Sequence, residues 1–190
     1  TVVQNTLNKA KELDDLGVNF AEFGTRRRHS YQVHDLVVNA LTQNKSSKFT
    51  GSSNVHFAMK YGVKPIGTHA HEWFMSHAAE YGFKMANSLS LEHWVDVYRG
   101  DLGVALSDTY TTEVFFEQFD KKFAKLFDGV RHDSGDPIEF TEKTIAHYEK
   151  NGINPLFKYI IFFNTFRISY WITNCAYRNI ICSSLMIIIR

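Results

Sequence analysis

The sequence predicts an α/β fold in which parallel strands alternate with helices. Short apolar segments end in polar loops and continue into segments with helical spacing, and this order recurs roughly every 25–30 residues. Each polar loop follows the carboxyl end of its strand. About six such units without a second domain indicate an incomplete (β/α) barrel, and an open doubly wound sheet is the alternative.

Strands are predicted where short apolar or alternating segments stop at small or polar residues. In chain order they cover residues 18–23, 48–50, 65–68, 103–106, 129–131 and 159–162. Because the carboxyl ends of parallel strands share one edge of a sheet, we expect the loops that follow them to gather on one rim. These loops are rich in His, Asp, Arg, Ser and Gly, which is typical of a ligand site.

Helices are predicted where apolar residues recur at three- and four-residue spacing. They cover residues 2–15, 30–43, a segment ending at Tyr61, a segment starting at Trp73 and Phe74, 89–98, a segment through Phe115, Phe119 and Phe123, and a last helix to about Lys150. The apolar face of the second helix is expected to carry Val33, Leu36, Val37 and Leu41.

The length and the amino-acid composition are typical of an ordinary globular protein, either one domain or part of a larger one. The chain has 190 residues, of which 44% are hydrophobic and 22% charged. A formal net charge of +1 gives no reason to expect nucleic acid or an anionic membrane as partner. Cys175 and Cys182 make neither a disulfide framework nor a zinc ligand set. We expect no signal peptide and a cytoplasmic location.

The composition changes abruptly near residue 159. Residues 159–190 contain no Asp or Glu, hold both cysteines and show no clear helical period. Asn174, Arg178 and Asn179 interrupt every window long enough for a membrane anchor. We therefore predict a partial barrel over residues 1–158 and, over 159–190, an aberrant hydrophobic tail that is non-native or poorly ordered.

The first candidate site lies between a predicted strand and a helix. His69 and His71 follow Gly67 and Thr68 at the carboxyl end of that strand. Ligands of α/β folds bind at this edge, and histidine changes its charge near neutral pH. A structural role for a strand-end histidine is equally compatible with the spacing, and the His69-x-His71 pair is also a pattern that can bind zinc.

The loop after residue 131 is the second candidate. Asp136 precedes Pro137 and Glu139, a pattern typical of a helix N-cap, so Asp136 is expected to cap a helix. Asp133 has no such structural role and can accept hydrogen bonds from ribose hydroxyls. Arg131 beside it can hold an anionic substituent.

Three further strand ends offer polar groups. Phe23 and Arg26 can stack on a flat ring and pair with its acid group, although a solvated basic turn is the alternative. Ser53 lies at an expected helix N-terminus, which suits an anion or is an ordinary cap. Asp108 can be a cap or a ligand. Each signal is weak by itself.

In this order, the motifs closely resemble those of the nicotinate phosphoribosyltransferases. The matching segments are 22–28, 51–55, 60–68, 70–73, 106–109 and 129–137, and the resemblance covers roughly residues 1–162. It implies a type II phosphoribosyltransferase with an irregular α/β barrel. The implied reaction, the first step of NAD salvage from nicotinate, joins nicotinate to phosphoribosyl pyrophosphate and gives nicotinate mononucleotide and pyrophosphate. ATP hydrolysis is coupled to it, and ATP and Mg²⁺ are the implied cofactors.

The resemblance also implies roles for individual residues. His71 matches the histidine that ATP phosphorylates, whereas His69 falls at a variable position. Asp133 is similar to the acid that binds ribose hydroxyls, and Asp108 to an acid facing the same pocket.

The remaining matches concern the nicotinate ring. Phe23 and Arg26 match ring-stacking and ring-binding positions, and Arg131 a second nicotinate or ribosyl contact. Ser53 stands where the related nicotinamide enzymes carry an aspartate; a hydroxyl can donate to the nicotinate carboxylate, which an aspartate would repel.

The chain departs from the family pattern at both ends. The family's N-terminal domain, which helps complete the active site across a homodimer interface, is missing from this sequence. The expected Ile-Ile-Phe-Ser-Asp becomes Ile-Ile-Phe-Phe-Asn at residues 160–164, and the last barrel strands are not found. An inactive truncated fragment that binds only a ligand or a partner subunit is therefore one alternative. A metal-dependent barrel hydrolase is a remote one, because only His132 could join His69 and His71.

Overall fold

The computed structural model describes residues 1–44, 48–155, 159–163 and 185–189. The chain divides into two compact units, the first formed by residues 1–67 and 162–190 and the second by residues 68–161. In both units strands alternate with helices, and neighbouring strands pair in parallel. The predicted α/β class is therefore confirmed. The incomplete barrel stays a prediction.

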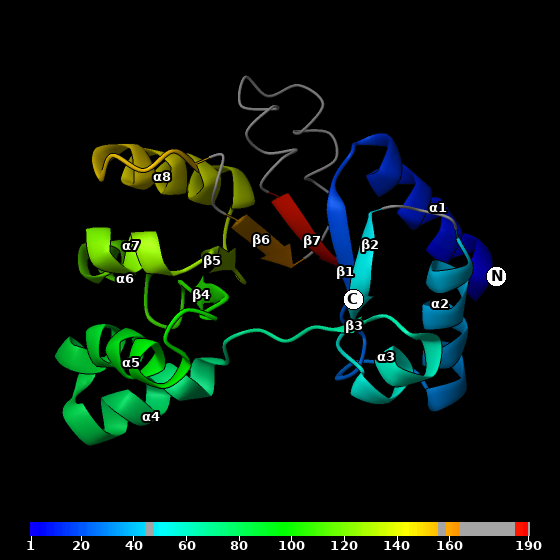
Figure 1. Cartoon of the computed structure of the whole chain (residues 1–190), viewed down its shortest axis with the longest axis horizontal. Coiled ribbons are helices and arrows are strands. Elements are labelled where there is room, and N and C mark those ends of the chain that lie inside the picture. The colour runs from blue at the N-terminus through cyan, green and yellow to red at the C-terminus, as the bar shows by residue number, and fades with distance from the viewer. Residues whose placement is uncertain (45–47, 156–158, 164–184, 190) are drawn as a thin grey trace. The chain divides into compact units, whose positions relative to one another are not determined.

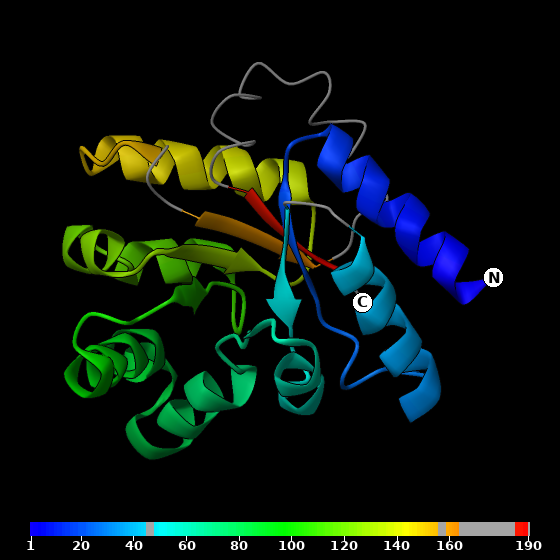
Figure 2. The same cartoon turned by 45° about the vertical axis from the view of Figure 1, so that its right-hand side comes forward.

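The first unit is a parallel sheet with helices along it (Figures 1 and 2). Its elements are α1 (Val2–Asp15), β1 (Asn19–Glu22), α2 (Tyr31–Gln43), β2 (Phe49–Ser52), α3 (Val55–Tyr61), β3 (Lys64–Pro65) and β7 (Leu185–Ile189). The strands lie in the order β3-β2-β1-β7. Phe20, Ala21, Leu41 and Phe57 are almost fully buried and belong to the core of this unit.

The apolar face of α2 differs from the prediction. Leu36 is 48% exposed, whereas His34, Val38 and Leu41 are buried. These three follow the i, i+4, i+7 spacing of one helix face, and Leu36 lies outside that stripe. The sequence pattern failed here because it counted only apolar side chains, and a histidine occupies one position of the buried face.

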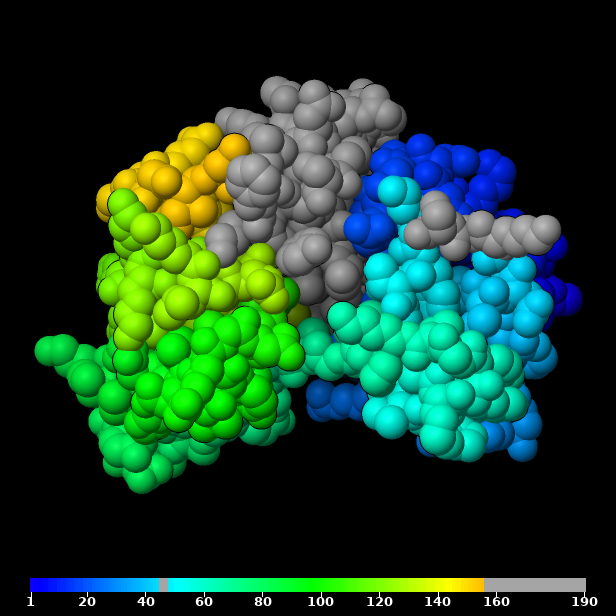
Figure 3. Space-filling model, in the orientation of Figure 1, coloured from blue at the N-terminus to red at the C-terminus, as the bar shows by residue number. Residues whose placement is uncertain are grey.

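The second unit contains α4 (His71–Tyr81), α5 (Phe83–Tyr98), β4 (Val104–Leu106), α6 (Thr112–Gln118), α7 (Lys121–Leu126), β5 (Gly129–His132) and α8 (Pro137–Lys150), and the first residues of β6 (Tyr159–Phe163). Strands β4 and β5 pair in parallel, with Leu106 opposite Arg131. Helices α4 and α5 pack against each other, and Figure 3 shows their green atoms side by side. Gly82, at a φ of 83°, separates the two helices, a conformation that favours glycine.

The predicted helix through Phe115, Phe119 and Phe123 is in fact two helices. Helix α6 ends before Phe119, and Asp120 caps the start of α7 by accepting hydrogen bonds from the backbone of Lys122 and Phe123. An aspartate favours a cap over a helix interior because its short side chain reaches the free N–H groups. The continuous phenylalanine spacing concealed this break.

The other predictions for strands and helices agree with the structure, with boundaries shifted by a few residues. The third strand is short, covering only Lys64–Pro65. Asp136 caps α8 as predicted, accepting hydrogen bonds from the backbone of Ile138 and Glu139 at 2.8 and 3.2 Å. The predicted tail contains strand β6, which was expected, and strand β7, which was not. Residues 164–184 and 190 of that tail lie outside the described residues.

Candidate active site

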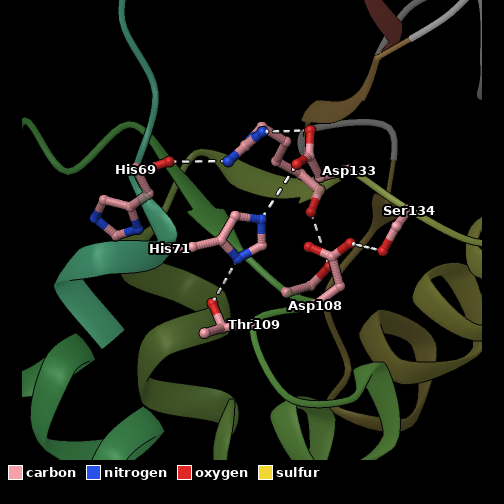
Figure 4. Close-up of polar contacts among 8 residues, drawn as sticks. His69, His71, Asp108, Thr109, Asp133 and Ser134 are labelled. Carbon is pink, nitrogen blue, oxygen red and sulfur yellow. Dashed lines mark hydrogen bonds and ion pairs between the residues drawn. The ribbon is translucent and has the colours of Figure 1, made fainter. Parts of the chain in front are cut away.

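His71 lies at the centre of a polar cluster in the second unit (Figure 4). Strands β4 and β5 end side by side, so the loops that follow them bring Thr109 and Asp133 together. His71, the first residue of α4, lies between them: its Nδ1 is 3.1 Å from Thr109 Oγ1 and its Nε2 is 3.1 Å from Asp133 Oδ2. The imidazole is 35% exposed and therefore accessible to a ligand.

The partners of His71 define which ring nitrogen carries a proton. An ionised carboxylate only accepts hydrogen bonds, so the Nε2 that faces Asp133 is the donor. In the neutral ring the Nδ1 lone pair then accepts a hydrogen bond from the Thr109 hydroxyl. A carboxylate on one nitrogen fixes the tautomer and the orientation of the ring. Nδ1 is therefore the ring nitrogen that can act as a nucleophile once the Thr109 hydroxyl turns away from it.

Arg131 supports this carboxylate through a buried guanidinium. Its side chain is only 5% exposed; Nη1 donates to Asp133 Oδ1 at 3.0 Å and Nη2 donates to the backbone oxygen of His69 at 2.9 Å. The guanidinium thus links the loop before α4 to the loop after β5. Both Nη atoms donate within the protein, so the observed contacts give Arg131 a supporting position, and its direct contact with a substrate stays a prediction.

Asp108 belongs to the same group of strand-end loops. Ser134 donates to Asp108 Oδ2 at 2.6 Å, and Ser107 donates to the backbone oxygen of Arg131 at 2.8 Å. These bonds tie the loop after β4 to strand β5 and its following loop. The structure therefore brings together four predicted site residues, His71, Asp108, Arg131 and Asp133.

The N-terminus of α4 adds a favourable field for an anion. Ala70 is its N-cap and makes no side-chain cap hydrogen bond. The first backbone N–H groups of a helix have no partner within the helix, and the helix dipole places partial positive charge there. A phosphate group near His71 would therefore lie at a site suited to negative charge.

His69 has a different environment from His71. It is 4% exposed, and its ring lies edge-on to Trp94 at a centroid distance of 4.0 Å, with Phe74 and Phe127 also in contact. Burial, aided by the charge of Arg131, lowers the pKa of His69 to about 4. His69 is thus a neutral core residue near pH 7, consistent with its predicted structural alternative.

The acid stability of the chain should reflect this pKa. The folded protein resists protonation of His69 down to about pH 4, whereas the unfolded chain protonates it near its ordinary value of 6.5. The contribution of neutral His69 to the free energy of unfolding is therefore complete above pH 6.5. It is lost as the pH falls towards 4, by roughly 3 kcal/mol in total. We expect His69→Phe to remove most of this loss, measured as the free energy of unfolding at pH 7 and pH 4.5. The exposed His29→Phe variant is the control, and an equal pH dependence in both variants would contradict the prediction.

The histidine pair does not form a joint ligand set. Figure 4 shows the rings of His69 and His71 directed to opposite sides. His132 is buried against Phe140, and burial lowers its pKa although the nearby carboxylates oppose the shift. Within the described ranges no group of three or more His, Cys, Asp or Glu side chains is arranged to hold a metal ion. The spacing that suggested a zinc hydrolase thus does not bring the three rings together.

The other predicted site residues lie in the first unit. Phe23 and Arg26 follow β1, with Phe23 half-buried and Arg26 exposed, and Ser53 follows β2. Ser53 Oγ donates to Thr25 Oγ1 at 2.9 Å, which joins the two loops. This arrangement offers an aromatic face, a guanidinium and a hydroxyl on adjacent strand ends.

Sequence reasoning missed the residues that support these loops. Glu22, His34 and Ser52 are each no more than 2% exposed. A charged residue directly after Phe20 and Ala21 in a strand, and a histidine on the buried stripe of a helix, were signals that could have identified two of them. Thr109 was seen in its motif, but nothing in the sequence indicated its contact with His71.

Comparisons with known proteins place the chain among relatives of one kind. The model of the nicotinate phosphoribosyltransferase (NAPRTase) family matches residues 18–175, beyond residue 162, where the resemblance in the sequence analysis stops. The nicotinate phosphoribosyltransferase of Chromohalobacter salexigens is 68% identical over 157 residues, which are 83% of this chain and 40% of that protein. The enzyme of the same name from Methanosarcina mazei is 52% identical over 159 residues, 84% of this chain and 39% of its own length.

Solved structures give the same assignment. The crystal structure of nicotinate phosphoribosyltransferase from Vibrio cholerae has a TM-score of 0.87 and 38% identity, and the match covers 99% of this chain and 45% of that one. The enzyme from Porphyromonas gingivalis has a TM-score of 0.84 and 41% identity, covering 98% and 48%. This chain thus spans less than half the length of these relatives. With the family model covering most of its residues, the chain belongs to the nicotinate phosphoribosyltransferase family.

Proposed function

We propose that this chain carries catalytic residues of a nicotinate phosphoribosyltransferase. The reaction joins nicotinate to phosphoribosyl pyrophosphate, giving nicotinate mononucleotide and pyrophosphate, while ATP is hydrolysed to ADP and phosphate. The observation that carries the proposal is His71, held between Thr109 and Asp133 at the N-terminus of α4. Family membership and the names of the relatives support it.

His71 is the proposed acceptor of the γ-phosphoryl group of ATP. Its Nδ1 lone pair forms the N–P bond while the bond between phosphorus and the bridging oxygen breaks and ADP leaves. Asp133 keeps the proton on Nε2 and offsets the positive charge that develops on the ring. The α4 N-terminus favours the negative charge of the transferred group.

The second chemical step is displacement at the ribose. The ring nitrogen of nicotinate forms a bond to the anomeric carbon as the bond to pyrophosphate breaks, and positive charge develops on the ribosyl centre. We infer that Asp133 and Asp108 stabilise this charge and accept hydrogen bonds from ribose hydroxyls, because fixed carboxylates need no reorganisation during the reaction. Asp108 is already an acceptor for a hydroxyl, that of Ser134.

The ring of nicotinate is assigned to the residues on the strand ends of the first unit. Phe23 would stack on the ring and Arg26 would pair with its carboxylate. The Ser53 hydroxyl, which now donates to Thr25, can rotate to donate to that carboxylate.

Mg²⁺ is the proposed metal partner. The carboxylates of Asp108 and Asp133, with the hydroxyls of Thr109 and Ser134, are the hard oxygen donors that this ion prefers. When bound, it would neutralise charge on the phosphate groups of the substrates.

A homodimer of the intact protein and a cytoplasmic location belong to the same proposal. In the described part of the chain, no helix is long and apolar enough to cross a membrane.

Phosphorylation of His71 tests the function directly. The chain is incubated with ATP labelled at the γ-phosphate, and acid-labile, base-stable label is located by peptide mapping. We expect label on His71, none after His71→Ala, and unchanged label after His29→Ala, the exposed control. In the intact family member, His71→Ala should leave slow transfer without ATP.

Two outcomes would point elsewhere. Label that persists after His71→Ala would refute the assignment of this residue. Binding of nicotinate without label or product would support the alternative of an inactive ligand-binding fragment.

A further inference from the structure

A buried carboxylate lies beneath the two substrate loops of the first unit. Glu22 is 2% exposed and is the last residue of β1, directly before Phe23. Its Oε1 accepts a hydrogen bond from the backbone N–H of Gly24, and its Oε2 accepts one from the Ser52 hydroxyl at 2.6 Å. The Nε2 of His34, also 2% exposed, lies 2.9 Å from Oε2. The proposed reaction does not use any of these groups.

The same residue also holds the loop after β2. The backbone oxygen of Glu22 accepts a hydrogen bond from the Ser53 N–H at 2.8 Å. Ser52 Oγ, while donating to Glu22, accepts the backbone N–H of Asn54 at 3.0 Å, and Asn54 caps α3. Glu22 is therefore bonded, through its side chain and its backbone, to both loops that carry proposed ring-binding residues.

The close approach of the carboxylate explains the glycine after Phe23. A Cβ atom at position 24 would lie 2.5 Å from Glu22 Oε1, nearer than real Cβ atoms come to a neighbour. The φ of Gly24 is not among the positive values, so its backbone would accept alanine. An alanine here would have to push the Glu22 carboxylate away from the groups that donate to it.

We propose that Glu22 is the positioning residue of the nicotinate-binding loops. It sets the turn that carries Phe23 and Arg26 and, through Ser52, the turn that carries Ser53. The inference rests on the proposed function for the identity of the ligand, while the positioning itself depends only on contacts within the first unit.

Ligand binding by the full chain provides the first test. Glu22→Ala removes both acceptor oxygens, so the hydrogen bonds from the Gly24 N–H and the Ser52 hydroxyl are both lost. We expect the Kd for nicotinate to rise about tenfold. The Kd for phosphoribosyl pyrophosphate should stay the same, because its proposed contacts lie in the second unit. Glu12→Ala, the same change at an exposed position in the same unit, should leave both Kd values unchanged.

A merely structural role would give a different pattern. If Glu22 only stabilised the fold, both ligands would weaken together, in parallel with a lower melting temperature. Equal loss of affinity for both ligands, or no loss for nicotinate, would overturn the proposal.

Hydrogen exchange provides a test that needs no ligand. Amide exchange is measured in the wild type, Gly24→Ala, Glu22→Ala and the double variant. The Ser53 amide is followed in all four proteins. The Gly24 amide is followed only where position 24 is still glycine. Gly24→Ala should speed exchange at Ser53 about tenfold in the wild-type background, as expected for a lost hydrogen bond. In the Glu22→Ala background it should add little, because the oxygen that its Cβ would meet is gone.

This second test separates the two proposals. An effect of Gly24→Ala that is equal in both backgrounds would refute the positioning by Glu22. If the wild-type chain does not bind nicotinate, the proposed function fails for this chain, and the exchange rates still decide whether Glu22 positions the loops.

Discussion

Replacing Asp133 with alanine is expected to lower the free energy of unfolding by about 3–5 kcal/mol and to abolish the proposed ATP-dependent labelling of His71. The Arg131 side chain is 5% exposed, and its Nη1 donates to Asp133 Oδ1. Removing the carboxylate would leave a buried cation without this partner, which costs more than the pair itself contributes. His71 Nε2 would lose its acceptor at the same time. Urea-induced unfolding and the ATP-dependent labelling of His71 measure the two effects.

Two further variants separate the loss of stability from the loss of chemistry. Asp133→Asn keeps one acceptor oxygen, so it should destabilise the chain less than alanine while still weakening the labelling of His71. Asp101→Ala removes an exposed aspartate from the same unit and should change stability by no more than about 0.5 kcal/mol. If Asp133→Ala changed the stability as little as Asp101→Ala, Arg131 would have found another partner. This ion pair would then not hold the loops.

Gly51→Ala is expected to have the largest effect on the first unit, a loss of about 3 kcal/mol of stability. Gly51 has a φ of 154° and pairs with Lys64 in the neighbouring strand. A Cβ at this position would run into the backbone oxygen of Lys64 and come within 3.1 Å of Ile66 Cδ1. Because backbone atoms cannot move aside as a flexible side chain can, β2 and β3 would have to separate. Thermal and urea unfolding followed by circular dichroism measure the loss.

Gly67→Ala is the matched control for this prediction. Nothing lies within 4 Å of a Cβ built at Gly67, and its φ is not among the positive values. We expect it to change stability by no more than about 0.5 kcal/mol in either direction. If Gly51→Ala were equally mild, the close pairing of β2 with β3 would be wrong. The displacement of β2 in Gly51→Ala should also shift Ser52 and Ser53, which directly follow Gly51.

The fold could be predicted where local chemistry and periodicity agree. Asp136, Pro137 and Glu139 formed a helix start that needed no tertiary information, and the structure confirms it. The break at Asp120 could not be seen, because an aromatic residue recurs every four positions across it. Strand β7 could not be predicted either, since an isolated apolar segment at residues 185–189 does not reveal that β1 is its partner.

The grouping of the candidate site residues at strand ends could be predicted, but the contacts that support them could not. Polar loops at carboxyl ends indicated His71, Asp108 and Asp133, and the structure places them in one cluster. The burial of Arg131, and its bond to the His69 backbone, depends on residues 62 positions apart. No local pattern contains such a contact. Glu22 was overlooked for the same reason, because its partners Ser52 and His34 come from other elements.

The place of β1 between β2 and β7 has a consequence during synthesis on the ribosome. Residues 19–22 leave the ribosome before residues 186–189, which form their second neighbour, have been added. At usual rates of elongation this interval lasts roughly 10–30 s. For that time one edge of β1 can pair with another nascent chain, a contact that chaperones bound to translating ribosomes would have to prevent.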